Sequence, residues 1–286
     1  MTETTILPSH PSCYSTSLMA LLCLAGITLA ELFTVFADAR LGLILHTLIL
    51  TSLIFYSSRV RRRSGFLLLL ALIPLPLIRI VSLSLPLANF PLVYWFLLTS
   101  LPLFVTALMV ARLLGWGWRD LGLSLSLKGA PVQLLIAATG LFFGYVEYQI
   151  LRPAPLIERL SWQTIWLPAV ILLISTGFLE ELLFRRVLQR PAIKVLGVWP
   201  GITYGALLFA VFHIGYRSPA DVLFVFLVGI FFGWVVWKTH SLVGVTLAHG
   251  LTNIALFLVI PFYASGVNGM VAGGLFEITR TVIVAL

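Results

Sequence analysis

Six polar residues with the chemistry of proton transfer and charge stabilisation interrupt three otherwise apolar stretches of this sequence: Glu180, Glu181, Arg185, His213, His249 and Asn253. Carboxylates and imidazoles accept and donate protons or bind metal ions, and amide N–H groups stabilise developing negative charge. Inserting an ionisable residue into a membrane span costs about 2.5 to 3.5 kcal/mol. Such residues in apolar stretches therefore indicate a catalytic site, a transport relay or a buried ion-pair network.

The spacing of the first group separates its two glutamates. Glu181 and Arg185 are four residues apart, so they lie one turn apart on the same helix face and can form an ion pair. Glu180 points about 100° away from Glu181 on a helix of 3.6 residues per turn. We therefore expect Glu181 to pair with Arg185 and Glu180 to face the interior of a helix bundle.

The same spacing of four residues recurs between Phe209 and His213 and between His249 and Asn253. Each pair shares one face of its helix. Counting a rise of 1.5 Å per residue from the expected cytoplasmic helix ends puts Glu180, His213, His249 and Asn253 at depths of about 14 to 21 Å. These four residues, on three helices, are therefore expected to meet in one layer near the middle of the membrane.

The elements that must position these residues are membrane spans. The chain has 286 residues, of which 60% are hydrophobic and only 10% charged, and its mean hydropathy is +1.08. Soluble domains carry about 25% charged residues, and disordered chains combine low hydrophobicity with high charge. Both classes are excluded, and the sequence predicts a polytopic membrane protein.

Apolar runs of the length needed to cross a bilayer as helices, about 20 residues, recur along the chain. The alternating pattern of barrel strands is missing from the sequence. The predicted fold class is therefore all-α, a polytopic transmembrane helix bundle of about nine spans, with eight to ten as the range. Pro74, Pro76 and Pro86 are expected to kink the third span. The runs are 17–37, 41–57, 65–88, 91–114, 130–151, 164–189, 199–214, 221–238 and 242–262.

Three parts of the chain are expected. Residues 1–128 are predicted to form an amino-terminal transmembrane bundle of unknown role. The connection 115–129, which contains several polar residues, separates this bundle from residues 129–263. The latter part holds all six of the candidate site residues named above. Residues 264–286 form a weaker apolar tail.

The net charge of +8 could indicate binding to nucleic acid, but basic cytoplasmic loops explain it better in a membrane protein. We therefore expect the lipid bilayer, and no nucleic acid, as a partner. By loop position, 12 of the 18 Lys and Arg residues fall on the side of the Arg59–Arg63 cluster and four on the opposite side. This asymmetry predicts an amino terminus inside the cell.

Other polar residues in the apolar runs are expected to have structural roles. Arg79 is expected to snorkel or to line a cavity. Glu31, Asp38 and Glu147 lie near predicted helix ends and are expected to be interfacial, and the single His46 is expected to be structural.

The polar residues form three motifs on separate spans. In chain order they are EExxxR at Glu180–Arg185, FxxxH at Phe209–His213 and HxxxN at His249–Asn253. This set resembles the motifs of the CAAX protease and bacteriocin-processing (CPBP, or Abi) family of intramembrane endopeptidases. The resemblance covers about residues 164–260. One departure is Arg186, where relatives often place a glycine.

The resemblance implies a membrane endopeptidase with a glutamate-type mechanism. Glu180 and His213 would hold and activate a water, with the glutamate as general base. His249 and Asn253 would donate hydrogen bonds to the oxyanion of the tetrahedral intermediate. The resemblance also implies a bacterial cytoplasmic-membrane protein whose substrate is a peptide or a membrane-anchored protein.

Glu181 and Arg185 would, by the same resemblance, fix the helix that carries Glu180, and no cofactor is expected. A zinc-dependent version of the site stays open as an alternative, because two histidines and one or two glutamates are zinc-ligand types, although the sequence holds no HExxH motif. A non-catalytic membrane protein, either a transporter or a self-immunity factor, is the other alternative.

Overall fold

The computed structural model describes residues 13–59, 63–123 and 129–264. Within these ranges all regular structure is helical, and nine helical stretches are long and apolar enough to cross a membrane. The prediction of an all-α polytopic bundle of about nine spans is confirmed. Nearly all of the expected tail, and Arg61 and Arg62 of the Arg59–Arg63 cluster, lie outside the described residues.

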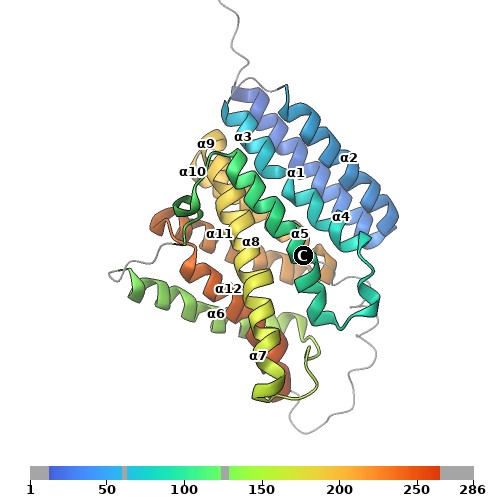
Figure 1. The fold of residues 1–286 in the computed structure, drawn as a ribbon, viewed down its shortest axis with the longest axis vertical. Helices are drawn as coiled ribbons and strands as arrows, with labels where there is room; N and C mark the ends of the chain where they lie inside the picture. Colours follow the sequence, from blue (N-terminus) through green and yellow to red (C-terminus); the bar gives the residue numbers. More distant parts are fainter. Residues whose placement is uncertain (1–12, 60–62, 124–128, 265–286) are drawn as a thin grey trace, which may run out of the picture.

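The first four spans pack beside one another (Figure 1). As predicted, prolines interrupt the third span: its first helix ends at Leu72, and the second begins at Pro74. Proline is tolerated in the first turn because that turn's N–H groups have no partner within the helix. The bounds are α1 (Cys13–Phe36), α2 (Ala39–Ser57), α3 (Arg63–Leu72), α4 (Pro74–Ser84), η1 (Leu87–Asn89), α5 (Leu92–Leu113) and η2 (Trp118–Leu121).

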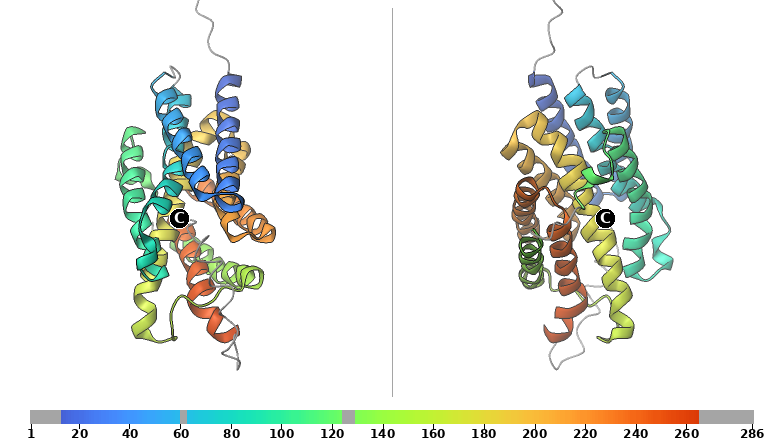
Figure 2. Two further views of the ribbon diagram at one scale, coloured as in Figure 1. Left: turned by 90° about the vertical axis from the view of Figure 1, so that its right-hand side faces the viewer. Right: turned by 60° about the vertical axis from the view of Figure 1, so that its left-hand side comes forward.

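Of the other five spans, one is a long helical rod of 35 residues, which runs from α7 to α9, and the remaining four are arranged around it. In Figure 1, α6 and α11 run across the direction of this rod, and Figure 2 shows the same arrangement from two further sides. The bounds are α6 (Ala130–Leu151), α7 (Trp162–Ile171), η3 (Leu172–Phe178), α8 (Leu179–Glu181), η4 (Leu182–Leu188), α9 (Gln189–Leu196), α10 (Val198–Phe212), η5 (His213–Tyr216), α11 (Pro219–Thr239), α12 (Val243–Ile254), η6 (Ala255–Val259) and α13 (Ile260–Ala264).

Within the rod, the glutamate pair lies in a single α-helical turn, α8, between two π-helical segments, η3 and η4. A π-helix closes wider turns, with hydrogen bonds from residue i to i+5, and such segments are frequent at functional sites. The wide turns change the direction in which the side chains before and after Glu180 and Glu181 point.

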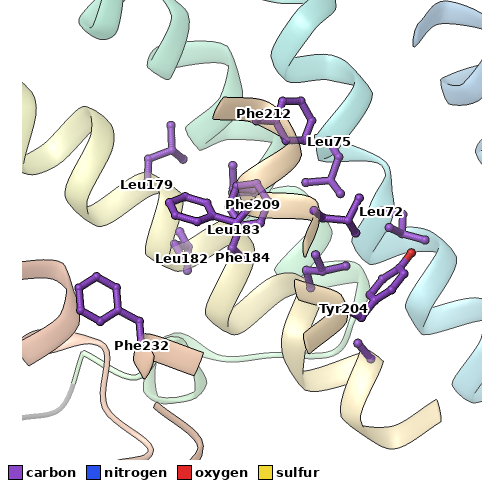
Figure 3. Packing of buried hydrophobic residues seen from close by; sticks show 14 of the residues in the cluster. Leu72, Leu75, Leu179, Leu182, Leu183, Phe184, Tyr204, Phe209, Phe212 and Phe232 are labelled. Carbon is purple, nitrogen blue, oxygen red and sulfur yellow. The ribbon is translucent and has the colours of Figure 1, made fainter. Parts of the chain in front are cut away.

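One apolar core continues from the amino-terminal helices into the rod and α10. Leu72 and Leu75 of the third span belong to the same buried cluster as Leu183 of the rod and Phe212 of α10 (Figure 3). Burial of apolar area stabilises this arrangement at roughly 25 cal/mol per Å². The rod is therefore held in place by helices from both halves of the chain.

A buried ion-pair cluster joins the amino-terminal helices to α10. Glu31 is ion-paired with Arg79 at 2.6 Å and with His46 at 3.1 Å, and all three side chains are buried. Arg79 also donates a hydrogen bond to the carbonyl oxygen of Phe212, at the end of α10. Glu31 and Arg79 are thus paired inside the protein, and the expectation of an interfacial Glu31 and a snorkelling Arg79 is wrong. The expectation that His46 is structural is confirmed.

Two glycines of α6 allow α12 to approach closely. A Cβ atom at Gly140 would overlap the carbonyl oxygen of Ala248, and one at Gly144 would lie 2.7 Å from the carbonyl oxygen of Thr252. Small residues four apart let helix backbones approach in membrane proteins. This contact fixes the position of α12, the helix that carries the HxxxN motif.

We expect Gly140→Ala to destabilise the protein by about 1 to 3 kcal/mol, because the methyl group can be accommodated only if α12 moves. The measurement is thermal unfolding of the purified protein in detergent. Gly205→Ala is the matched control, since a Cβ there would lie 3.8 Å from its nearest neighbour and fits without movement. Equal unfolding temperatures for the two variants would contradict this account of the α6–α12 contact.

Candidate active site

The four residues expected to share one layer line a single cavity inside the bundle. Glu180 enters it from α8, His213 from the end of α10, and His249 and Asn253 from α12. The cavity volume is about 40 Å³, and a volume of roughly 10 to 15 Å³ is enough for one water. The site therefore has room for water beside the carboxylate of Glu180.

Glu181 turns away from this cavity and forms two interactions. Its Oε2 atom is ion-paired with Nε of Arg185 at 3.1 Å, as the spacing predicted. Its Oε1 atom accepts a hydrogen bond from Nδ1 of His249 at 2.9 Å, a contact that the sequence did not indicate. Both Glu181 and Arg185 are almost completely buried. A single carboxylate thus links the rod to α12.

Glu180 is 3% exposed, and none of its contacts within the described chain is a hydrogen bond. Its nearest ionisable partner is Nε2 of His249, at 3.6 Å from Oε2. Because Nδ1 of His249 is engaged by Glu181, the imidazole lies between the two glutamates. Glu180 is therefore the carboxylate that can accept hydrogen bonds from a molecule in the cavity, whereas Glu181 is engaged by His249 at Oε1 and by Arg185 at Oε2.

His213 is oriented by its own helix. Its Nδ1 atom lies 2.9 Å from the carbonyl oxygen of Phe209, one turn earlier. A carbonyl only accepts, so Nδ1 carries the proton, and Nε2 of the neutral ring is left as an acceptor. The ring lines the cavity. His213 therefore presents an acceptor atom that can bind a water hydrogen.

The ring of Phe209, in the FxxxH motif, packs against Arg185 and against both histidines of the site. Its ring lies 4.7 Å from the guanidinium carbon of Arg185, 4.8 Å from the His213 ring and 5.8 Å from the His249 ring. An aromatic face attracts a cation and excludes water from it. Phe209 thus covers Arg185 and sets the spacing of the two histidines.

Asn253 is held by the rod. Its Nδ2 atom donates a hydrogen bond of 2.8 Å to Oγ1 of Thr176, whose hydroxyl in turn donates to the carbonyl oxygen of Leu172. A side-chain amide has two N–H donors, so one remains for a ligand in the cavity. Thr176 itself lines the cavity. It therefore orients the amide of Asn253.

The residues of the site do not fit a zinc centre. Within the described ranges no three His, Cys, Asp or Glu side chains are grouped closely enough to hold a metal ion. His249 directs both ring nitrogens toward glutamates, and Nδ1 of His213 is bonded to a backbone carbonyl. Structural and catalytic zinc sites need at least three protein ligands around one point.

Arg186, the departure from the family pattern, is accommodated outside the cavity. Its guanidinium donates a hydrogen bond of 2.6 Å to the carbonyl oxygen of His240, at the end of α11. It packs against Gly122, where a Cβ would overlap it and where φ is +76°. The larger residue thus ties the rod to α11 without entering the site.

Several residues of the cavity were not expected from the sequence. Glu147 was expected to be interfacial, yet it is 7% exposed and lines the cavity together with Thr176 and Tyr216. No local pattern marks these residues, because their helices meet the motif helices only in the folded bundle. A carboxylate inside an apolar run was the one available signal for Glu147.

A comparison with protein families supports the resemblance independently. Residues 161–255 match the family described as type II CAAX prenyl endopeptidase Rce1-like. No curated protein and no solved structure matches the chain. The matched segment spans the rod, α10, α11 and α12, which carry all three motifs.

The match covers about a third of the chain, the same third on which the motif resemblance rests. Residues on the first four spans lie outside it. The predicted resemblance to the CAAX proteases is thereby confirmed, and with it the enzyme class, a membrane endopeptidase of the CAAX protease type.

Proposed function

We propose that the cavity is the active centre of a glutamic-type intramembrane endopeptidase, which hydrolyses a peptide bond within or near the membrane. The observation that carries this proposal is the convergence of Glu180, His213, His249 and Asn253 on one small cavity. The Rce1-like match over residues 161–255 supports the reaction class.

In the first step, Glu180 and His213 together hold the attacking water. Each offers an acceptor atom to the cavity, so the two can bind the two hydrogens of one water. Glu180 takes a proton as the oxygen attacks the carbonyl carbon of the scissile bond. The apolar surroundings strengthen the interaction of the carboxylate with that proton.

In the second step, the tetrahedral intermediate collapses. Its oxyanion accepts hydrogen bonds from the free N–H of Asn253 and from Nε2–H of His249 when both ring nitrogens of that residue carry a proton. The proton held by Glu180 passes to the leaving nitrogen, the carbon–nitrogen bond breaks, and the carboxylate is regenerated. No metal or other cofactor takes part in this scheme.

We also propose a bacterial cytoplasmic membrane as the location, with the amino terminus inside. Arg185 and Arg186 are buried, so they do not count as loop charges. The count of basic residues is then ten on the side of the Arg59–Arg63 cluster and four on the opposite side. This asymmetry still favours an amino terminus inside the cell.

The division into a bundle of residues 1–128, a protease part of residues 129–263 and a tail of residues 264–286 also stays a proposal. The hydrogen bond from Arg79 to Phe212, next to His213, supports a role for the bundle in holding the site. The substrate is proposed to be a peptide or a membrane-anchored protein.

Glu180→Gln should lower the rate of proteolysis by roughly 10²- to 10⁴-fold, because an amide of nearly the same shape cannot take a proton from water. The test compares wild-type and variant protein in proteoliposomes, using acyl-anchored peptides and mass spectrometry of the products. Glu158→Gln is the control, since Glu158 is an exposed carboxylate away from the cavity. Wild-type cleavage by Glu180→Gln would refute the general-base assignment.

Glu181→Gln should act on stability as well as on rate. It leaves the buried Arg185 without its charge partner, and breaking one half of a buried pair costs about 3 to 5 kcal/mol. A lower unfolding temperature than that of Glu180→Gln is therefore expected in the same detergent. The double variant Glu181→Gln with Arg185→Met should recover part of the stability but not the activity. Equal stability of the two single variants would contradict the bridging role of Glu181.

Chelation should leave the activity of the purified enzyme unchanged, because the proposed chemistry uses only side chains and water. The measurement is the cleavage rate before and after incubation with 1,10-phenanthroline and removal of the chelator. Loss of activity that added zinc restores would replace this mechanism with a metal-dependent one.

A further inference from the structure

A second carboxylate, which the proposed mechanism does not use, faces the cavity. Glu147 lies on α6, one turn before the helix ends at Leu151, and its side chain is 7% exposed. It lines the same cavity as Glu180. Among the described residues it has neither a hydrogen-bond donor nor an ion-pair partner.

Asp221 stands behind Glu147, in the first turn of α11, and is completely buried. Neither of its carboxylate oxygens has a hydrogen-bond partner in the described chain. The residue that caps α11 is Ser218, whose hydroxyl accepts a hydrogen bond from the backbone N–H of Asp221. The carboxylate of Asp221 is therefore not used as a helix cap. The carboxylates of Glu147 and Asp221 are close enough to repel each other when both are charged, and Tyr216 lines the wall of the same cavity as Glu147.

Aromatic rings flank the two carboxylates. Phe143 lies one turn before Glu147 on α6, and Phe224 lies one turn after Asp221 on α11. Both rings line the cavity and pack edge to face, with centroids 6.2 Å apart. Carboxylates combined with aromatic faces are the groups that bind alkylammonium and guanidinium ions.

Two other buried carboxylates of the bundle have an arginine partner, which Glu147 and Asp221 lack. Glu31 is neutralised by Arg79, and Glu181 by Arg185. Two neighbouring carboxylates in an apolar interior repel each other and lose their hydration, a cost that only a cation or a shared proton offsets. A cation bound at Glu147 would lie in the cavity that Glu180 also lines.

We propose that Glu147 and Asp221 form a specificity subsite that binds a cationic side chain, Lys or Arg, of the substrate beside the bond that is cleaved. The inference rests on the proposed function and deepens it by naming the substrate class. The amino terminus of a peptide is also an ammonium group, so the test separates the two sources of charge.

The experiment uses full-length protein in nanodiscs and acyl-anchored peptides of about ten neutral residues, in which a single lysine is moved from position to position. Each peptide is amino-terminally acetylated and is matched by one with norleucine in place of lysine. Binding is measured by fluorescence anisotropy on Glu180→Gln protein, so no cleavage is needed. At one or two adjacent positions, lysine should bind on the order of 10- to 100-fold more tightly than norleucine.

Adding Glu147→Gln, or separately Asp221→Asn, should bring this ratio toward one. Adding Glu158→Gln should leave it unchanged, because that carboxylate is exposed. A lysine preference that survives Glu147→Gln, or the lack of a preference at every position, would overturn the subsite in favour of a pair that shares a proton. A preference that appears only with free amino termini would assign the site to the peptide terminus and overturn the side-chain proposal.

Measurements on the wild-type enzyme distinguish failure of the proposed function from failure of the subsite. If wild-type protein binds the lysine peptides with the predicted preference but cleaves none of them, the endopeptidase mechanism fails while the subsite stands. If it cleaves lysine and norleucine peptides equally, and Glu147→Gln leaves that ratio unchanged, the subsite fails while the mechanism stands.

Discussion

The Glu181 carboxylate, shared between Arg185 and His249, is the interaction on which the arrangement of the site depends. A charge in an apolar interior must be paired and hydrogen-bonded, because removing it from water costs several kcal/mol. Arg185 comes from the same helical rod, whereas His249 comes from α12. Satisfying one buried charge therefore fixes the distance between the two helices that supply Glu180 and Asn253.

The small residues of the helix contacts make this pairing sterically feasible. A Cβ atom at Gly177 of the rod would lie 2.9 Å from the backbone nitrogen of Gly250, so these two segments touch through glycine on both sides. On its other side, α12 lies against Gly140 and Gly144 of α6. These close backbone contacts accompany the hydrogen bond of 2.9 Å between Glu181 and His249.

The buried carboxylates among the described residues fall into two groups with different consequences. Glu31 and Glu181 are neutralised by buried arginines and hold helices together. Glu180, Glu147 and Asp221 have no such cation and gather at the cavity or directly behind it. Natural proteins tolerate this kind of local destabilisation mainly where function requires it. The cavity volume of about 40 Å³ is enough for water beside these carboxylates.

The sequence by itself determined the features that depend on local periodicity. Length and hydropathy determine the all-α class and the span count, because a chain in lipid must satisfy all its backbone hydrogen bonds internally, as a helix does. The spacing of four residues fixes the Glu181–Arg185 pair, since both side chains belong to one helix. The prolines at 74 and 76 mark the interruption of the third span for the same local reason.

Only the tertiary structure decided which helix faces meet. The hydrogen bond between His249 and Glu181 joins residues 68 positions apart, and the neighbouring charges of Glu147 and Asp221 come from two helices that cross the rod. Helix crossing depends on side-chain size and close backbone contact over the whole bundle, and no local pattern encodes it. The sequence therefore identified the residues of the motifs, whereas packing decided their partners and brought the unpaired carboxylates to the cavity.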